Sequence, residues 1–66
     1  MRIILNGKAD EVDEGASVLE LIEKLGLSGR RLAVLMDNEV VRKSQFGDVR
    51  LRADCKIEIV QMVGGG

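Results

Sequence analysis

The sequence contains no histidine, tryptophan or tyrosine, and it has one phenylalanine and one cysteine among 66 residues. Histidine is the usual general base near neutral pH, so its absence removes the Ser-His and Cys-His nucleophile pairs. A single cysteine cannot form an internal disulfide or a cysteine-based zinc site. We therefore expect a protein that is not an enzyme, that binds no metal or cofactor of its own, and that acts as a partner or substrate of other proteins.

A strong charge excess and a long apolar run are missing as well. Ten basic residues stand against eleven acidic ones, for a net charge of −1, whereas binding to nucleic acid needs a basic excess or stripe. No stretch approaches the roughly 20 apolar residues of a membrane span, and no basic-then-apolar leader opens the chain. The sequence therefore predicts no nucleic-acid partner, no membrane partner and a cytoplasmic location.

The residues that are present suffice for one small domain, because 45% of them are apolar and can build a single thin core. Residues 2–5 form an apolar strand, and Asn6-Gly7 is a strong hairpin signal. The return strand at 9–13 is polar apart from Val12, which is typical of a sheet edge. The chain therefore begins with a β-hairpin.

A helix follows this hairpin and begins at Ser17. Ser17 and Glu20 have the spacing of a capping box, in which a hydroxyl and a carboxylate satisfy free backbone donors. Gly26 is the expected left-handed terminator, with Leu27 folding back on the last turn. Five apolar residues follow helical spacing and are expected to anchor the sheet: Val18, Leu19, Leu21, Ile22 and Leu25.

The second half of the chain is predicted to form strands separated by short turns. Residues 32–36 are a nearly continuous apolar strand, and Asp37-Asn38 turns the chain into a short strand at 40–41. Residues 44–46 indicate a brief helical turn, and the last strand runs from about 56 to 62. The expected inward side chains are Leu32, Val34, Met36, Phe46, Leu51, Ile57 and Ile59.

The order strand, strand, helix, strand, short strand, strand limits the possible folds. The right-handed crossover rule makes the first and last strands parallel neighbours in the centre of the sheet. We therefore predict an α+β fold of the β-grasp, or ubiquitin-like, type, with a mixed sheet of four to five strands around one main helix plus a short helical turn. The domain is expected to span residues 1–62, followed by a flexible glycine tail at 63–66.

The tail, Val63-Gly64-Gly65-Gly66, directly follows an apolar strand. Glycines bring no side chain to a core, and their backbone can thread a narrow channel in another protein. The reactive group would be the α-carboxylate of Gly66, which an adenylating partner can turn into an acyl donor, while Gly64 and Gly65 provide access. The alternative interpretation is a frayed terminus or a leftover linker.

With these features together, the sequence resembles the ThiS family over its whole length. The resemblance rests on Asn6-Gly7, the helix led by Ser17, residues 32–34, 40–41 and 57–60, and the glycine end. It implies a sulfur carrier for the thiazole ring of thiamin. A ThiF-like adenylyltransferase would activate Gly66 with ATP and magnesium, a persulfide donor would convert the carboxylate to a thiocarboxylate, and a ThiG-like thiazole synthase would take the sulfur.

Two turn positions depart from the family pattern. Family members often have Asp-Gly-Asp before the last strand, where this chain has Ala53-Asp54-Cys55, so Asp54 must take the turn geometry that glycine would supply. A proline is common where Arg42 stands. Cys55 has two interpretations, a thiol that receives or passes sulfur and a structural turn residue with partial burial.

The outward side of the sheet suggests where a partner binds. Because side chains alternate along a strand, Val60 and Met62 are expected on the face away from the helix. With Ile4 and Leu35 they would form an exposed apolar patch that recruits the adenylating enzyme. The alternative is scattered surface apolar residues, which are normal in soluble proteins.

Two other functions remain open. A MoaD-like carrier for molybdopterin or another acceptor would use the same chemistry at Gly66, although such subunits often carry proline before the tail and run longer. A non-catalytic TGS-like β-grasp binding module would share the fold and would not need a free glycine terminus. Deleting the last two glycines separates a carrier from a binding module.

Overall fold

The computed structural model describes residues 1–62, and the glycine tail at 63–66, expected to be a separate flexible segment, lies outside the described residues. Five strands form one mixed sheet in the order β2-β1-β5-β3-β4. The described elements are β1 (Arg2–Leu5), β2 (Lys8–Glu11), α1 (Val18–Lys24), β3 (Leu32–Met36), β4 (Glu39–Val41), the short 3-10 helix η1 (Lys43–Gln45) and β5 (Lys56–Gln61).

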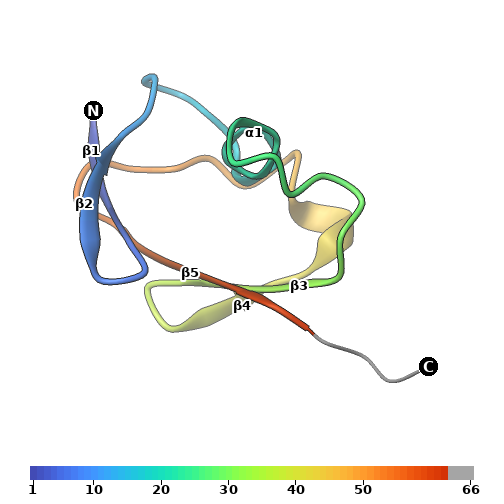
Figure 1. Cartoon of the computed structure of the whole chain (residues 1–66). Coiled ribbons are helices and arrows are strands. Elements are labelled where there is room, and N and C mark those ends of the chain that lie inside the picture. Colours follow the sequence, from blue (N-terminus) through green and yellow to red (C-terminus); the bar gives the residue numbers. More distant parts are fainter. Residues whose placement is uncertain (63–66) are drawn as a thin grey trace.

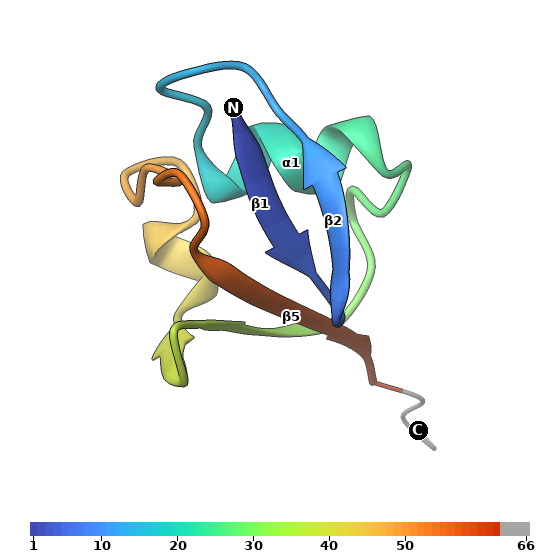
Figure 2. The ribbon, with the colours of Figure 1, turned by 90° about the vertical axis from the view of Figure 1, so that its left-hand side faces the viewer.

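The sheet has the β-grasp arrangement that the sequence predicts. β5 lies in the centre, parallel to β1 and antiparallel to β3, and the two outer strands pair antiparallel to their hairpin partners. Figure 1 shows α1 on one face of the sheet, with the other face left open. In Figure 2, β5 runs past the tip of the β1–β2 hairpin toward the C-terminal end of the chain.

Both ends of α1 are closed by the signals in the sequence. The Ser17 hydroxyl accepts the Glu20 N–H at 3.1 Å, and the Glu20 carboxylate accepts the Ser17 N–H at 3.1 Å, which completes the capping box. At the other end Gly26 has φ 73°, and the Leu27 N–H donates to the Ile22 carbonyl at 3.0 Å. This is the Schellman pattern, and it places Leu27 against the core.

Three of the five apolar residues expected to anchor the sheet do so, and two do not. Val18, Leu21 and Ile22 are buried, whereas Leu19 and Leu25 are exposed. Leu25 is the C-terminal cap residue, beyond the last full turn. Leu19 lies where α1 meets the chain after η1, since its N–H donates to the Phe46 carbonyl. The buried stripe of α1 is therefore narrower than the five apolar positions at helical spacing predict.

The remaining inward predictions agree with the structure, and Leu32 is half-buried and packs against the core. Phe46 and Leu51 are buried, and the Leu51 N–H donates to the Ala16 carbonyl at 2.8 Å, which ties the segment before β5 to the start of α1. Val12 is also buried, although β2 ends one residue earlier, at Glu11. The buried sheet residues that face α1 include Ile3, Val34, Met36, Val41, Ile57 and Ile59.

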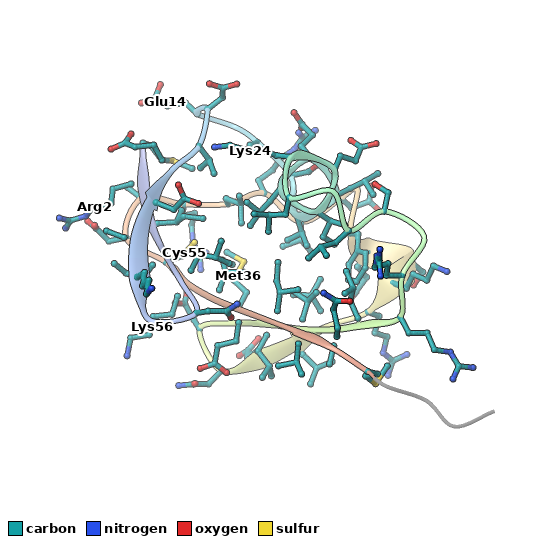
Figure 3. The ribbon with its side chains drawn as sticks, viewed as in Figure 1. Arg2, Glu14, Lys24, Met36, Cys55 and Lys56 are labelled. Atoms are coloured by element: carbon teal, nitrogen blue, oxygen red, sulfur yellow. The ribbon has the colours of Figure 1, made fainter. Side chains whose placement is uncertain are left out.

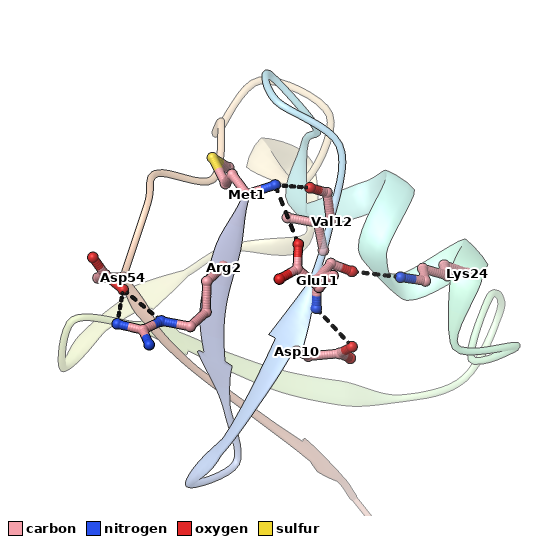
Figure 4. Close-up of polar contacts among 7 residues, drawn as sticks. All are labelled: Met1, Arg2, Asp10, Glu11, Val12, Lys24 and Asp54. Atoms are coloured by element: carbon pink, nitrogen blue, oxygen red, sulfur yellow. Dashed lines mark hydrogen bonds and ion pairs between the residues drawn. The ribbon is translucent and has the colours of Figure 1, made fainter.

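Polar contacts fasten the edge hairpin to its neighbours (Figure 4). The Lys24 ammonium donates to the Glu11 carbonyl at 2.6 Å, joining the end of α1 to β2. Asp54 adopts φ 63°, so it takes the left-handed geometry that a glycine would supply in this turn. Its carboxylate lies 2.7 Å from the Arg2 guanidinium. Asp54 thus tolerates this turn and also pairs with Arg2 of β1.

Candidate functional site

The site is the central strand β5 and the surfaces beside it, because this strand leads into the glycine tail. β5 pairs with β3 from Met36↔Ile57 to Leu32↔Gln61. The pairing continues one step further, since the Met62 N–H donates to the Arg31 carbonyl at 2.9 Å. The predicted reactive residue Gly66 and its neighbours Gly64 and Gly65 lie outside the described residues. Among the described residues, backbone pairing with the sheet therefore continues as far as Met62, four residues before Gly66.

Hairpin side chains hold β5 at two points along its length. At its start, the Asp37 carboxylate accepts the Lys56 N–H at 2.9 Å, while the Asp37 N–H donates to the Lys56 carbonyl at 2.8 Å. Further along, the Asn6 carboxamide makes two bonds to the backbone of Ile59. Both residues have positive φ, 49° and 48°, and both were expected from the sequence only as turn residues.

The Asp37 carboxyl is tuned by these contacts. The backbone N–H of Lys56 has the largest effect and, with the Arg52 guanidinium at 3.2 Å, holds the pKa of Asp37 below its ordinary value of 3.8. Desolvation opposes this shift and is the weaker influence. Asp37 is therefore a carboxylate at neutral pH, and it accepts hydrogen bonds at the start of β5.

The open face of the sheet carries the apolar side chains predicted to bind a partner. Val60 is 55% exposed and Met62 53% exposed, and Leu35 is half-buried on the same face. Val40, 72% exposed, pairs with Leu35 and extends this surface. It was missed in the sequence because the inward or outward direction of a three-residue strand cannot be read without its register. We call Leu35, Val40, Val60 and Met62 the outer apolar patch.

Ile4 does not join this patch. It is half-buried on β1, where it pairs with Ala9 on one side and with Lys56 on the other. Glu58 of β5 pairs with Leu35, so charged side chains of the central strand lie between Ile4 and Leu35. The predicted cluster therefore lacks Ile4 as a neighbour, and its other members lie on β3 (Leu35), on β5 (Val60) and directly after β5 (Met62).

Cys55 is more deeply enclosed than the partial burial expected of it. Only 4% of the residue is exposed, and Figure 3 shows it with Met36 between the sheet and the helix. Its carbonyl accepts the Ile4 N–H at 2.9 Å, just before β5 begins. These contacts favour the structural interpretation, because sulfur transfer would require the thiol to leave the core.

Within residues 1–62, no group of three histidine, cysteine, aspartate or glutamate side chains is placed to hold a metal ion. In the same part of the chain, no helix has the length and apolar character to cross a membrane.

Comparison with known proteins identifies the family. The sequence profile of the ThiS family matches residues 3–66. The chain belongs to the ThiS family. Among solved structures, the crystal structure of the thiamine biosynthesis protein ThiS from Geobacter metallireducens is 28% identical, with full coverage of both chains and a TM-score of 0.85. The solution structure of that protein superposes with a TM-score of 0.80 and 88% of its chain covered.

Curated relatives of this ThiS-family chain are much longer proteins. A thiazole synthase from Paramagnetospirillum magneticum is 33% identical, and one from Magnetococcus marinus is 35% identical, each over all 66 residues. The chain spans 20% of the length of each of these proteins. A ThiS-like segment thus occurs within proteins that are named for thiazole synthesis.

Proposed function

We propose that this chain is a sulfur carrier in thiamin biosynthesis and that the α-carboxylate of Gly66 is its reactive group. The observation that carries the proposal is the ThiS-family match, which runs from β1 through the terminal glycines. The likeness to the thiamine biosynthesis protein from Geobacter metallireducens, seen in its crystal and solution structures, supports the pathway. The absence of histidine from the sequence fits a protein that is acted upon.

The proposed chemistry begins with activation of the chain end. A ThiF-like adenylyltransferase, using ATP and magnesium, joins the Gly66 carboxylate to AMP and releases pyrophosphate. The terminal sulfur of a persulfide donor then attacks the acyl carbon and expels AMP, which leaves an acyl disulfide. A thiol reduces the S–S bond and frees the thiocarboxylate. A nucleophile approaches this carbon without meeting a Cβ, because Gly66 has none.

The sulfur acceptor in this proposal is a ThiG-like thiazole synthase. The two curated relatives are named thiazole synthases and contain a segment similar to the whole of this chain. A carrier segment and the enzyme that consumes its sulfur must meet, so their presence in one protein supports the pairing.

The outer apolar patch is the surface that we assign to docking of the adenylyltransferase, because four apolar side chains gather there on the face that α1 leaves open.

Removing Gly65 and Gly66 tests the proposal against a binding module. We expect the truncated protein to keep its unfolding midpoint, because the core described within residues 1–62 ends at Ile59, and to lose sulfur transfer to thiazole synthase completely. The matched control is Glu14→Gln, a full-length variant changed at an exposed site away from the tail, and it should retain sulfur transfer. A truncated protein that still supports thiazole formation contradicts the proposal.

A further inference from the structure

Asn6 makes a pair of hydrogen bonds that a turn residue does not need. Its side-chain Oδ1 accepts the Ile59 N–H at 2.9 Å, and its Nδ2 donates to the Ile59 carbonyl at 3.2 Å. Its own backbone N–H donates to the Ile57 carbonyl at 2.8 Å. The two partners of the carboxamide are thus the donor and the acceptor of one residue, 53 positions away along the chain.

The Asn6 carboxamide bonds to β5 at the point where β1 ends and no longer pairs with that strand. The parallel register of β1 and β5 comprises Ile4↔Lys56 and Leu5↔Ile57, after which the chain reverses through Asn6 and Gly7, with φ 48° and 83°. Without a substitute, the Ile59 backbone groups that point toward β1 would have no strand to face. Only a carboxamide of this length offers a donor and an acceptor side by side while tolerating a left-handed backbone.

Within residues 1–62, Ile59 is the last point at which the β1–β2 hairpin holds β5. Beyond Ile59, the pairing of β5 is with β3, through Leu32↔Gln61 and the bond from the Met62 N–H to the Arg31 carbonyl. Gly66 follows Ile59 by seven residues. Ile59 is therefore the last described residue of β5 that is bonded to the β1–β2 hairpin on one side and paired with β3 on the other.

We propose that Asn6 is a positioning residue for the reactive chain end, and this role rests on the proposed function. By locking Ile59, it sets the direction of residues 60–62, where β5 is paired with β3 alone, so the activating enzyme meets a preoriented strand. Loss of the lock leaves the Gly66 carboxylate chemically unchanged. The enzyme must then order the end of β5 on binding, which weakens binding while the chemical step proceeds as before.

Two substitutions at Asn6 and one at a matched position test this role. Asn6→Gly keeps a residue suited to the turn and removes both bonds to Ile59. Asn6→Asp keeps the size and the acceptor but places a second oxygen against the Ile59 carbonyl. Asn38, which has φ 70° in the β3–β4 turn, provides the control Asn38→Gly, because it removes an asparagine from a similar backbone conformation.

The readouts are steady-state adenylation by a ThiF-type enzyme and amide hydrogen exchange of the folded carrier. In both Asn6 variants we expect KM for the carrier to rise about fivefold to tenfold with kcat unchanged. In Asn6→Gly, which removes the acceptor of the Ile59 N–H, we also expect the Ile59 amide to exchange faster. Asn38→Gly should leave both quantities at their original values. All assays are run well below the unfolding midpoint of each variant.

The outcomes separate this role from the proposed function. Faster exchange at Ile59 with an unchanged KM overturns the positioning role and leaves the carrier function standing. Equal losses in kcat and in the folded fraction also overturn it, because they mark a purely structural contribution. If the unsubstituted carrier forms no adenylate, the proposed function fails and this role falls with it.

Discussion

At the scale of single residues, both hairpin turns contribute a side chain that pairs with the central strand. Asp37 bonds the Lys56 backbone and Asn6 bonds the Ile59 backbone. The sequence predicts both residues as turn formers from their identity and their position between apolar runs. It could not predict their second role, because the partners lie 19 and 53 positions away and are reached only when the sheet has formed.

The charge of Asp37 makes a pH-dependent contribution to stability. Its pKa is lowered in the folded state, so this contribution is present above its ordinary value of 3.8 and is lost as the pH falls through the lower folded value. In urea unfolding, the native protein should be more stable than Asp37→Asn at pH 7, and the difference should shrink below pH 4. A stability difference that is the same at pH 7 and pH 3 contradicts this assignment.

At the scale of elements, α1 is the part whose limits the sequence predicts best. The capping box, the left-handed Gly26 and the return of Leu27 are all present, because each depends on contacts within four or five residues. The burial of Leu19 and Leu25 was predicted wrongly, because helical spacing defines a stripe but not its width. Leu19 lies beside the end of η1, where its N–H donates to the Phe46 carbonyl, a tertiary contact that helical spacing does not predict.

Removing the cap of α1 should lower stability measurably. Ser17 is almost fully buried and both capping bonds are formed, so we expect Ser17→Ala to reduce the free energy of unfolding by about 1 kcal/mol. Ser44→Ala, at an exposed position in η1, is the matched control and should change it by less than about 0.5 kcal/mol. Equal effects of the two substitutions in urea titrations contradict the importance of the cap.

At the scale of the whole molecule, the fold and its central strand follow from the order of elements and the crossover rule, whereas the shape of the docking surface does not. Ile4 was expected in one patch with Leu35, Val60 and Met62, yet it pairs with Lys56 of β5, whereas Leu35 pairs with Glu58 on the other side of that strand. Val40 joins the patch through its register with Leu35. Strand alternation predicts which face a side chain takes, but neighbours on that face depend on strand order and register, which the sequence leaves open.

The outer apolar patch yields a prediction for partner binding. Val60→Asp and Met62→Asp should each weaken adenylation by a ThiF-type enzyme at least tenfold through KM, since a charge replaces an apolar contact that becomes dry on binding. Both side chains are about half exposed, so the thermal unfolding midpoint should change little. Leu19→Asp, an exposed leucine on the helix side, is the control and should leave KM unaltered. The docking assignment is wrong if all three variants behave alike.

The proposed function requires that one enzyme adenylates the Gly66 carboxylate and that a donor then supplies sulfur to it. Its most direct test is intact-mass spectrometry of the purified chain with a ThiF-type enzyme, ATP and magnesium, before and after adding a persulfide donor and a thiol. We predict the mass of the chain ending in a free Gly66 carboxylate, then the gain of one adenylyl group, then the exchange of one oxygen for sulfur. A chain that keeps its starting mass through both steps contradicts the account.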